Sequence, residues 1–437
     1  RTMDALFPAF NRSLKEVKAN KIVLALSGGM DSRVLLELLR RYQNENSISC
    51  LAVHVHHGLS ANADSWVQQC QKWCVDAGIE LAVEYVELSL QGQSLEECAR
   101  EARYQALAKH LNSGDILLTG QHSDDQLETF LLALKRGSGP KGLSAMAKQM
   151  PFKGATLIRP LLDISREQIA QYAHANALQW VDDESNQDTR FDRNFIRHQI
   201  TPVLKQRWPH IHSAVQRTSE LCAEQEALLE ELLSSTLASA MSGDGSLSIE
   251  FLAQQSERVR TQLIRMWFTY MGLKMPSRDH LAKVWQEVAI TRQDANPVLN
   301  LSGGQVRRFT ERLYWVNSVE DVTCWQSSVQ LNQSVILPDE LGSLKLVNSV
   351  QGNLSLQALQ TAPLRIIFDP EGLSAHPVGR GHSRKLKKLF QEYGVPSWLR
   401  RRLPILICGD QVVAIANLFI DLQFAGQDCE LIWDKSL

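Results

Sequence analysis

The chain has 437 residues, of which 44% are hydrophobic and 22% charged, a composition that excludes collagen-like, disordered and disulfide-scaffold proteins. At roughly 100–200 residues per domain, this length predicts two or three domains. The 46 lysines and arginines nearly balance the 48 acidic residues, giving a formal net charge of −2. A binding surface for a polyanion would therefore have to come from local clusters of basic residues.

The eight cysteines are scattered along the chain and include no C-x-x-C pair. We expect reduced, mostly buried thiols in a cytoplasmic protein rather than disulfides or a zinc site. The most apolar stretch, residues 403–420, is interrupted by Gly409-Asp410. That dipeptide predicts a β-hairpin rather than a membrane span. No secretory signal is recognisable, and no membrane partner is expected.

Short apolar runs alternate with helical patterns in the first part of the chain. The runs that predict strands are residues 21–26, 50–55, 81–86 and 115–119. Between them, residues 31–41 and 94–111 place apolar side chains on one side at helical spacing. This alternation predicts a Rossmann-like α/β domain with a parallel sheet, whose functional sites lie at the carboxyl ends of the strands.

The rest of the chain changes character twice. A helical pattern begins near residue 213, and its apolar face carries Leu221, Leu228, Leu229, Leu232 and Leu233. After about residue 320, short β runs are predicted at 328–337, 343–347, 365–368 and 405–420. We therefore predict a nucleotide-type α/β domain, a small helical domain and a small β-rich C-terminal domain, over residues 1–213, 214–318 and 319–437.

The first predicted strand leads directly into Ser27-Gly28-Gly29-Met30-Asp31-Ser32, which opens a helix. Two glycines allow a tight turn with inward-pointing N–H groups, the serines add hydroxyl donors, and a helix N-terminus favours an anion. We interpret this segment as a phosphate cradle, although it lacks the G-x-x-x-x-G-K-[ST] pattern of Walker-type loops. Asp31 would repel phosphates unless a cation intervened, so we expect it to hold Mg²⁺.

A second polar block follows the fourth predicted strand. Residues 120–129 read GQHSDDQLET, and Asp125 and Glu128 are spaced i, i+3, which places both on one helical face. Acids this close together repel each other, so we expect a metal ion or an amine to compensate them. A solvated acidic helix start is the alternative.

Basic residues lie before and after this block. Arg136 belongs to a glycine-rich loop suited to phosphate or RNA. Arg193 and Arg197 are spaced i, i+4 and form a clamp for phosphate or carboxylate. Arg100 and Arg103 are further cations, on the helix predicted over residues 94–111.

The loop S-G-G-x-D-S resembles that of the N-type ATP pyrophosphatases, the PP-loop enzymes, which cleave ATP between its α and β phosphates. With the second acidic block, the R-G-S-G and R-P-L-L motifs, and a stretch like R-N-x-I-R, the order and spacing closely resemble the tRNA(Ile)-lysidine synthetase family over nearly the whole chain. This chain departs from the family pattern at Gln121, before His122, and at Glu184, where the family usually has proline.

The resemblance implies a carbon–nitrogen ligase acting on an isoleucine tRNA with a CAU anticodon, with ATP, Mg²⁺ and L-lysine. ATP would adenylate the C2 oxygen of the wobble cytidine with release of pyrophosphate. The lysine ε-amine would then attack C2, and AMP would leave. The lysidine so formed changes the codon read from AUG to AUA and the amino-acid identity from Met to Ile.

The resemblance also implies roles for individual residues. The phosphate cradle would bind ATP through Ser27, Gly28, Gly29, Met30, Asp31 and Ser32. The catalytic candidates are Asp31, Asp125, Glu128, Arg193 and Arg197. Which acid handles the lysine ammonium and which the metal stays open, with Glu128 our choice for lysine.

Histidines lie at the end of the second predicted strand, and the family has a similar H-V-x-H-G-L stretch near the nucleotide. We therefore expect His54 and His57 to line the adenylate site. A structural role is the alternative, and the spacing argues against a metal site.

The C-terminal region carries a helix that is basic on one face, over residues 384–393, followed by an arginine triplet, and Glu392 is the acid that opposes them locally. Such a cluster predicts contacts with an RNA backbone, and a solvated face is the alternative. The residues expected to bind tRNA are Arg100, Arg103, Arg136, Arg384, Lys387, Lys388, Arg400, Arg401 and Arg402.

Three other functions fit less well. A tRNA thiolase with the same loop would need paired catalytic cysteines, and a glutamine-dependent synthetase would need a glutaminase domain. A nucleotide-gated RNA-binding protein would explain the phosphate cradle and the basic C-terminal helix but not the second acidic block. The sequence does not set the oligomeric state, and a homodimer stays open.

Overall fold

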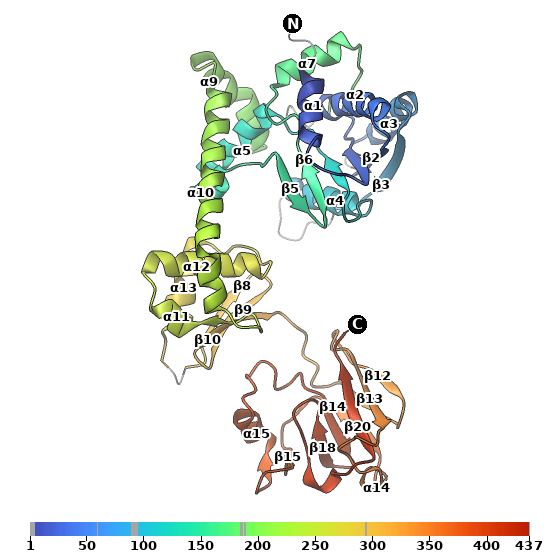
Figure 1. Cartoon of the computed structure of the whole chain (residues 1–437), viewed down its shortest axis with the longest axis vertical. Helices are drawn as coiled ribbons and strands as arrows, with labels where there is room; N and C mark the ends of the chain where they lie inside the picture. Colours follow the sequence, from blue (N-terminus) through green and yellow to red (C-terminus); the bar gives the residue numbers. More distant parts are fainter. Residues whose placement is uncertain are drawn as a thin grey trace. The chain divides into compact units, whose positions relative to one another are not determined.

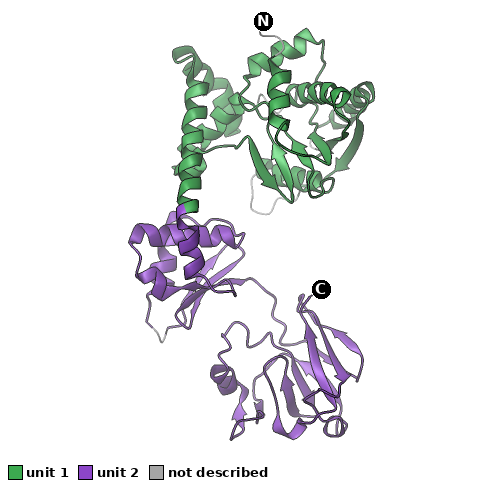
Figure 2. Ribbon diagram, in the orientation of Figure 1, with its two compact units in different colours: residues 1–231 green, residues 232–437 purple. Residues whose placement is uncertain are grey.

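The computed structural model describes residues 5–58, 60–88, 95–183, 187, 189–292 and 295–436 (Figure 1). Its contacts divide the chain into two compact units, residues 1–231 and 232–437 (Figure 2). The second unit contains most of the stretch predicted as a helical domain and all of the stretch predicted as β-rich. The three-domain division stays a prediction. Within the described residues, no helix has both the length and the hydropathy needed to cross a membrane.

A six-stranded sheet forms the centre of the first unit, in the order β3-β2-β1-β4-β6-β5. The four predicted strands are confirmed as β1 (Lys21–Ala25), β2 (Ser49–His56), β3 (Glu80–Tyr85) and β4 (Ile116–Leu118). All four run parallel, with Ile22 of β1 aligned with Cys50 on one side and Ile116 on the other. Their carboxyl ends therefore meet at one edge, as predicted.

The sheet also contains a hairpin that the sequence did not predict. It is formed by β5 (Gln149–Phe152) and β6 (Ala155–Ile158); β6 continues the parallel sheet beside β4, and β5 pairs antiparallel to β6. Each strand has four residues, too few for a clear periodic signal. Pro151 further weakens the strand pattern, and prolines are tolerated in edge strands such as β5.

Helices cover both faces of this sheet. Alternate residues of β1 point to opposite sides, so Ile22 and Leu24 belong to one core and Val23 to another. Helices α1 (Leu6–Leu14), α2 (Met30–Glu45), α3 (Ala63–Ala77) and α7 (Arg166–Ala175) pack into the first core, and α4 (Leu95–Ala108) packs into the second (Figure 1).

Further helices complete the first unit. In chain order, they are α5 (Ser123–Lys135), α6 (Pro140–Leu143), α8 (Asp192–Phe195), the π-helical turn η2 (Ile196–Ile200), α9 (Thr201–Arg207) and α10 (Ile211–Ala240). The helix predicted from residue 213 is thus confirmed as α10, but its leucine face is mostly not buried. Leu221 is 54% and Leu232 64% exposed, because the described hydrophobic cores do not extend to them. Leu233 packs on a core of the second unit.

The second unit begins with a small α/β arrangement around Trp267 and Phe268. Its four-stranded sheet has the order β7-β10-β9-β8. Its elements are β7 (Leu247–Ser248), α11 (Ile249–Ala253), α12 (Glu257–Tyr270), α13 (Arg278–Lys283), the π-helical turn η3 (Val284–Ala289), β8 (Val298–Leu301), β9 (Gly304–Phe309) and β10 (Arg312–Asn317).

The C-terminal part of this unit is rich in short strands, as predicted. A five-stranded sheet contains β11 (Gln326–Ser328), β14 (Leu364–Ile367), β17 (Ile405–Cys408), β18 (Gln411–Ile415) and β19 (Phe419–Ile420). A three-stranded sheet contains β12 (Ser334–Ile336), β13 (Ser343–Asn348) and β20 (Cys429–Asp434). The remaining elements are α14 (Leu356–Leu359), β15 (Ser374–Ala375), β16 (Arg384–Lys385), α15 (Leu386–Glu392) and η4 (Leu422–Phe424).

The hairpin predicted over 405–420 is confirmed, and Gly409 takes the positive φ of 62° that its turn requires. The single β run predicted at 328–337 is wrong. Its two ends belong to β11 and β12, which lie in different sheets. Asn332, at φ 64°, turns the chain between them, and such left-handed backbone interrupts a strand.

Candidate active site

The phosphate cradle lies between β1 and α2. Gly28 has a φ of 95°, a conformation that residues with a Cβ rarely adopt. The Oγ atoms of Ser27 and Ser32 are 3.0 Å apart, and Ser32 Oγ also accepts the Ser27 N–H at 3.0 Å. Helix α2 begins without a side-chain cap, which leaves N–H groups of its first turn available to an anion.

Gly120 brings the second polar block against this loop. A Cβ at this position would lie 3.2 Å from Asp31 Cβ and 3.3 Å from the Ser32 backbone nitrogen. A side chain here would therefore push β4 away from the start of α2. Sequence reasoning assigned Gly120 no role, because close approach of two segments leaves no mark in the spacing.

His122 connects Asp31 with Asp125. It is the N-cap of α5, where its Nδ1 accepts the Asp124 N–H and the Asp125 carboxylate accepts the His122 N–H. Its Nε2 lies 3.3 Å from Asp31 Oδ2 and 3.4 Å from Asp125 Oδ2. Burial lowers the pKa of His122, but Asp125 and Asp31 outweigh it and raise this pKa to about 9. Protonation of both ring nitrogens of His122 would break the hydrogen bond that Nδ1 accepts from the Asp124 N–H.

The two carboxylates of this group could hold a divalent cation. Asp31, His122 and Asp125 offer ligand atoms that all lie within 4.8 Å of one another. Magnesium prefers oxygen ligands and is usually held by one or two carboxylates together with substrate phosphates. The two aspartates beside the phosphate cradle meet that preference, whereas an imidazole nitrogen does not.

Glu128 lies one turn further along α5 and is held by arginines. Its carboxyl group is 1% exposed, and Arg197 donates to both oxygens at 2.9 Å. Arg193 approaches the same carboxylate at 3.5 Å, and Arg197 also reaches Asp125 Oδ1 at 3.2 Å. Burial raises the pKa of Glu128, while Arg197 lowers it, with a net rise. The predicted arginine clamp thus closes on carboxylates within the chain.

A proline explains the orientation of Arg197. Pro202 has no N–H to donate back to the carbonyl of His198, as an α-helix would require. The helix widens there into the π-helical turn η2, in which the Thr201 N–H bonds to Ile196 O. The Thr201 hydroxyl then donates to Arg197 O at 3.2 Å. Spacing alone treated this stretch as a regular helix.

Asp124 points away from the cradle. Its carboxylate forms an ion pair with the amine of Lys205 and accepts the Arg166 N–H, at the start of α7, at 3.2 Å. Burial raises the pKa of Asp124, but the hydrogen bond and charge of Lys205 outweigh it and lower this pKa. The compensation expected for the acidic block is therefore an amine for Asp124, and arginine and histidine for the other two acids.

Three segments of the chain match known protein families. Residues 6–204 match the PP-loop domain, residues 247–314 the TilS substrate binding domain, and residues 364–435 the TilS substrate C-terminal domain. Proteins named tRNA(Ile)-lysidine synthase match over the full length: that of Vibrio parahaemolyticus is 59% identical over 100% of both chains. The chain belongs to the tRNA(Ile)-lysidine synthase family. The family member of Vibrio vulnificus (strain CMCP6) is 59% identical over 99% of this chain and 100% of its own, and that of Photobacterium profundum 50% identical over 95% of each.

Membership of the tRNA(Ile)-lysidine synthase family makes this chain an ATP-using ligase that modifies tRNA. The segment from Ser27 to Ser32 falls within the matched PP-loop domain, and Gly120, just before α5, lies against it. The motif stretch containing Glu184 falls outside the described residues.

The two histidines that the sequence predicts to line the adenylate site have different surroundings. His54 is buried, and its Nδ1 lies 2.8 Å from Leu26 O, at the end of β1. That contact favours the structural alternative for His54. His57 is half-buried, and its Nδ1 has no hydrogen-bond partner. Burial and nearby Arg103 lower the pKa of His57. Arg103 and Arg100 flank the ring of Tyr104 at 5.4 and 5.8 Å.

The basic residues of the C-terminal part are only partly free. Helix α15 buries Leu386, Leu389 and Phe390, as predicted. Arg384, Lys387 and Lys388 line an open cavity of about 640 Å³, although Arg384 also pairs with Glu392 at 3.2 Å.

The side chains of the arginine triplet, which were expected to contact RNA, already have partners within the chain. Arg400 donates to Val395 O, Arg401 lies 4.0 Å from Asp369, and Arg402 donates to Glu320 O and to Asp339, both at 2.9 Å. Glu392 is thus not the one acid near these cations. Arg136 is exposed, and its Nε donates to Leu132 O.

Proposed function

We propose that this chain joins the ε-amine of lysine to C2 of the wobble cytidine in the CAU anticodon of an isoleucine tRNA. The observation that carries the proposal is the edge of the sheet where the phosphate cradle, two aspartates and an arginine-bound glutamate meet. Full-length similarity to tRNA(Ile)-lysidine synthases supports the choice of substrate. Such an enzyme would act on tRNA in the cytoplasm.

The chemistry has two steps. First, the C2 oxygen of the cytidine attacks the α-phosphorus of ATP; an O–P bond forms, and the bond to pyrophosphate breaks. Second, the neutral lysine amine attacks C2, the oxygen leaves with AMP, and the nitrogen loses a proton. In the first step, Ser27, Ser32 and the N-terminus of α2 would bind the phosphates.

Asp31 and Asp125 are the residues that would hold Mg²⁺, which supplies positive charge against the phosphates. Because His122 Nε2 lies 3.3 and 3.4 Å from the two carboxylates, we infer that His122 helps to position them. The proposal assigns no metal contact to His122.

The lysine ammonium needs a carboxylate that binds it and takes its proton during attack. Its free pKa is about 10.4, so about one amine in a thousand is neutral near pH 7. We assign this role to Glu128. Its contact to Arg193, at 3.5 Å, is longer than its contacts to Arg197. The ammonium would therefore replace Arg193, which would become free to bind phosphate or substrate.

The test is mass spectrometry of the wobble nucleoside after incubation with ATP, labelled lysine and tRNA. We expect the wild type to add one lysine to the cytidine and release pyrophosphate. Asp31→Asn should bind tRNA normally but lose roughly 10²–10³-fold in rate, as expected when a transition-state contact is removed. Asp163→Asn, at an exposed ion pair with Lys148, is the matched control. A wild type that releases no pyrophosphate with tRNA and lysine would contradict the proposal.

A further inference from the structure

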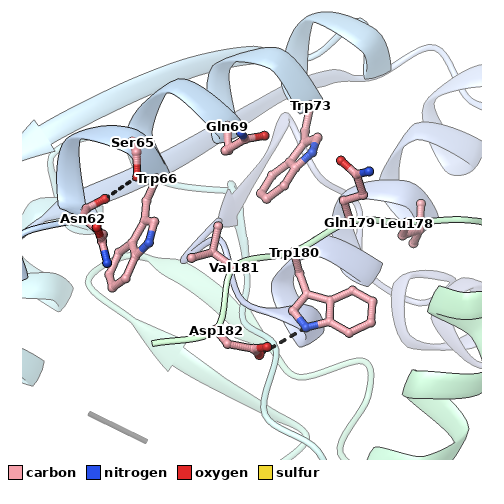
Figure 3. Close-up of a pocket in the computed structure, with 10 residues that line it drawn as sticks. All are labelled: Asn62, Ser65, Trp66, Gln69, Trp73, Leu178, Gln179, Trp180, Val181 and Asp182. Atoms are coloured by element: carbon pink, nitrogen blue, oxygen red, sulfur yellow. Dashed lines mark hydrogen bonds between the residues drawn. The ribbon is translucent and has the colours of Figure 1, made fainter. Parts of the chain in front are cut away.

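A cavity lined with tryptophans lies between α3 and the loop of residues 178–182 (Figure 3). Its volume is about 670 Å³, within the range of small-molecule sites. Trp66 and Trp73 project from the same face of α3, and Trp180 comes from the loop on the other side (Figure 3). The indole rings thus come from two separate elements around one space.

The polar groups of this cavity fit a neutral planar ligand. Among the described residues that line it there is no lysine or arginine, and the Arg33 guanidinium, 5.4 Å from the Trp73 ring centroid, is not one of the lining groups. Its acid, Asp182, accepts a hydrogen bond from Trp180 Nε1 at 3.3 Å. The side-chain amides of Asn62, Gln69 and Gln179 each offer both donors and acceptors. Aromatic faces with amide edges are the groups that bind nucleobases.

The two elements that line the cavity, the loop of residues 178–182 and α3, both lie against Gly28 of the phosphate cradle. The Val181 N–H, in the loop wall, donates to Gly28 O at 2.8 Å. On the other wall, Cys70 lies on α3 between the two tryptophans, and its Sγ is 3.6 Å from where a Cβ of Gly28 would be. A ligand in this cavity would therefore lie beside the site where ATP is cleaved.

We propose that this cavity holds an unstacked base of the tRNA, next to the base being modified; this inference rests on the proposed function. Enzymes that react with a base take it out of the stack, which removes a stacking surface from its neighbours. Indole rings supply a replacement surface, worth about 1–3 kcal/mol per base. The adenine of ATP is the rival occupant. It is disfavoured because His57, which is expected to line the adenylate site and whose Nδ1 has no hydrogen-bond partner among the described residues, lies near Arg103 of α4, on the opposite face of the sheet from α3.

The test compares Trp66→Ala and Trp180→Ala with the wild type, using a transcribed tRNA with a CAU anticodon as the probe. We expect tRNA affinity to fall about 5–150-fold, the equivalent of 1–3 kcal/mol. The slope of log affinity against log salt should stay unchanged, because no phosphate contact is lost. Phenylalanine at either position should restore part of the affinity. ATP affinity, measured separately, should change less than twofold.

Trp208→Ala is the matched control, since Trp208 is 55% exposed in the same unit and lies outside the cavity. Equal losses in the control and the cavity variants would overturn the inference. So would unchanged tRNA affinity, or a loss confined to ATP, which would assign the cavity to adenine. Circular dichroism and the unfolding midpoint verify that each variant is folded. Lysidine formation by the wild type is measured first, so a failure of the proposed function is recognised separately.

Discussion

At the start of α5, three acids within five positions have three different sets of partners. Asp124 binds Lys205, Asp125 lies between His122 and Arg197, and Glu128 receives the paired donors of Arg197. Successive helical positions point about 100° apart, so neighbours in sequence face different surroundings. Helical geometry thus gives each acid of one short motif a different set of partners.

Glu128→Gln tests the role of the most buried of these acids. If Glu128 binds the lysine ammonium, this variant should still release pyrophosphate but incorporate at least tenfold less labelled lysine, because the amide carries no charge and accepts no proton. Both products are measured in parallel, with Glu220→Gln, an exposed acid of α10, as the control. An equal drop in pyrophosphate and lysine incorporation would mean that Glu128 serves adenylation instead.

For individual residues, the sequence predicted which side chains lie near one another but not which partner each side chain contacts. Asp31, Asp125, Glu128, Arg193 and Arg197 were all candidates, and the structure places them around one point. Spacing could not predict that Arg197 would donate hydrogen bonds to both carboxylate oxygens of Glu128, because those contacts depend on how α5 packs against η2. Gly120 and His122 were missed as contributors for the same reason.

At the scale of elements, the turn from β1 into α2 depends on the backbone of one glycine. Gly28→Ala forces a Cβ into left-handed backbone, at a cost of about 1–2 kcal/mol. We expect the unfolding midpoint of the first unit to fall by roughly 2–4 °C per kcal/mol. Gly29→Ala is the control, because Gly29 has an ordinary φ of −73°. Thermal unfolding followed by circular dichroism measures both; equal midpoints for the two variants would contradict this account of the turn.

Elements with a strong internal pattern were predictable. The central strands β1 and β4 are apolar runs, because a sheet covered on both faces buries its central strands, whereas the edge strand β3 has no fully buried residue. The β5–β6 hairpin was not predictable, since each of its strands has four residues and β5 contains Pro151. For α10, the helix was predicted correctly but its burial was not. A helical apolar pattern identifies a helix, but it does not show which part of that helix packs against a hydrophobic core.

For the molecule as a whole, RNA affinity should depend on cations that are not already paired within the chain. Lys387→Ala and Lys388→Ala together should lower the slope of log tRNA affinity against log salt by roughly 0.7–0.9 per lost phosphate contact. ATP affinity should not change. Filter binding over a range of salt concentrations measures the slope.

Arg402→Ala is the contrasting variant. Its side chain is 13% exposed and bound to Asp339, so its loss should lower the unfolding midpoint of the second unit and leave the salt slope unchanged. A full change of slope in this variant would show that Arg402 binds phosphate despite its partners. The sequence revealed the positive charge of this region, but the acids that neutralise part of it come from distant segments and could not be foreseen.

Pro202, beside the π-helical turn that carries Arg197, also bears on how stability and activity are linked. It lies in the first turn of α9, where the missing N–H of a proline costs little and the penalty of a helix interior does not apply. Alanine would restore an N–H that His198 O could accept, but it would lose the roughly 1 kcal/mol of unfolded-chain entropy that a proline saves. Pro202→Ala should therefore unfold at no higher temperature than the wild type and ligate lysine more slowly, since an α-helical turn would rotate Arg197 away from Glu128; thermal unfolding and labelled-lysine incorporation measure the two effects. A selection for thermal robustness would thus keep this proline as firmly as a selection for activity.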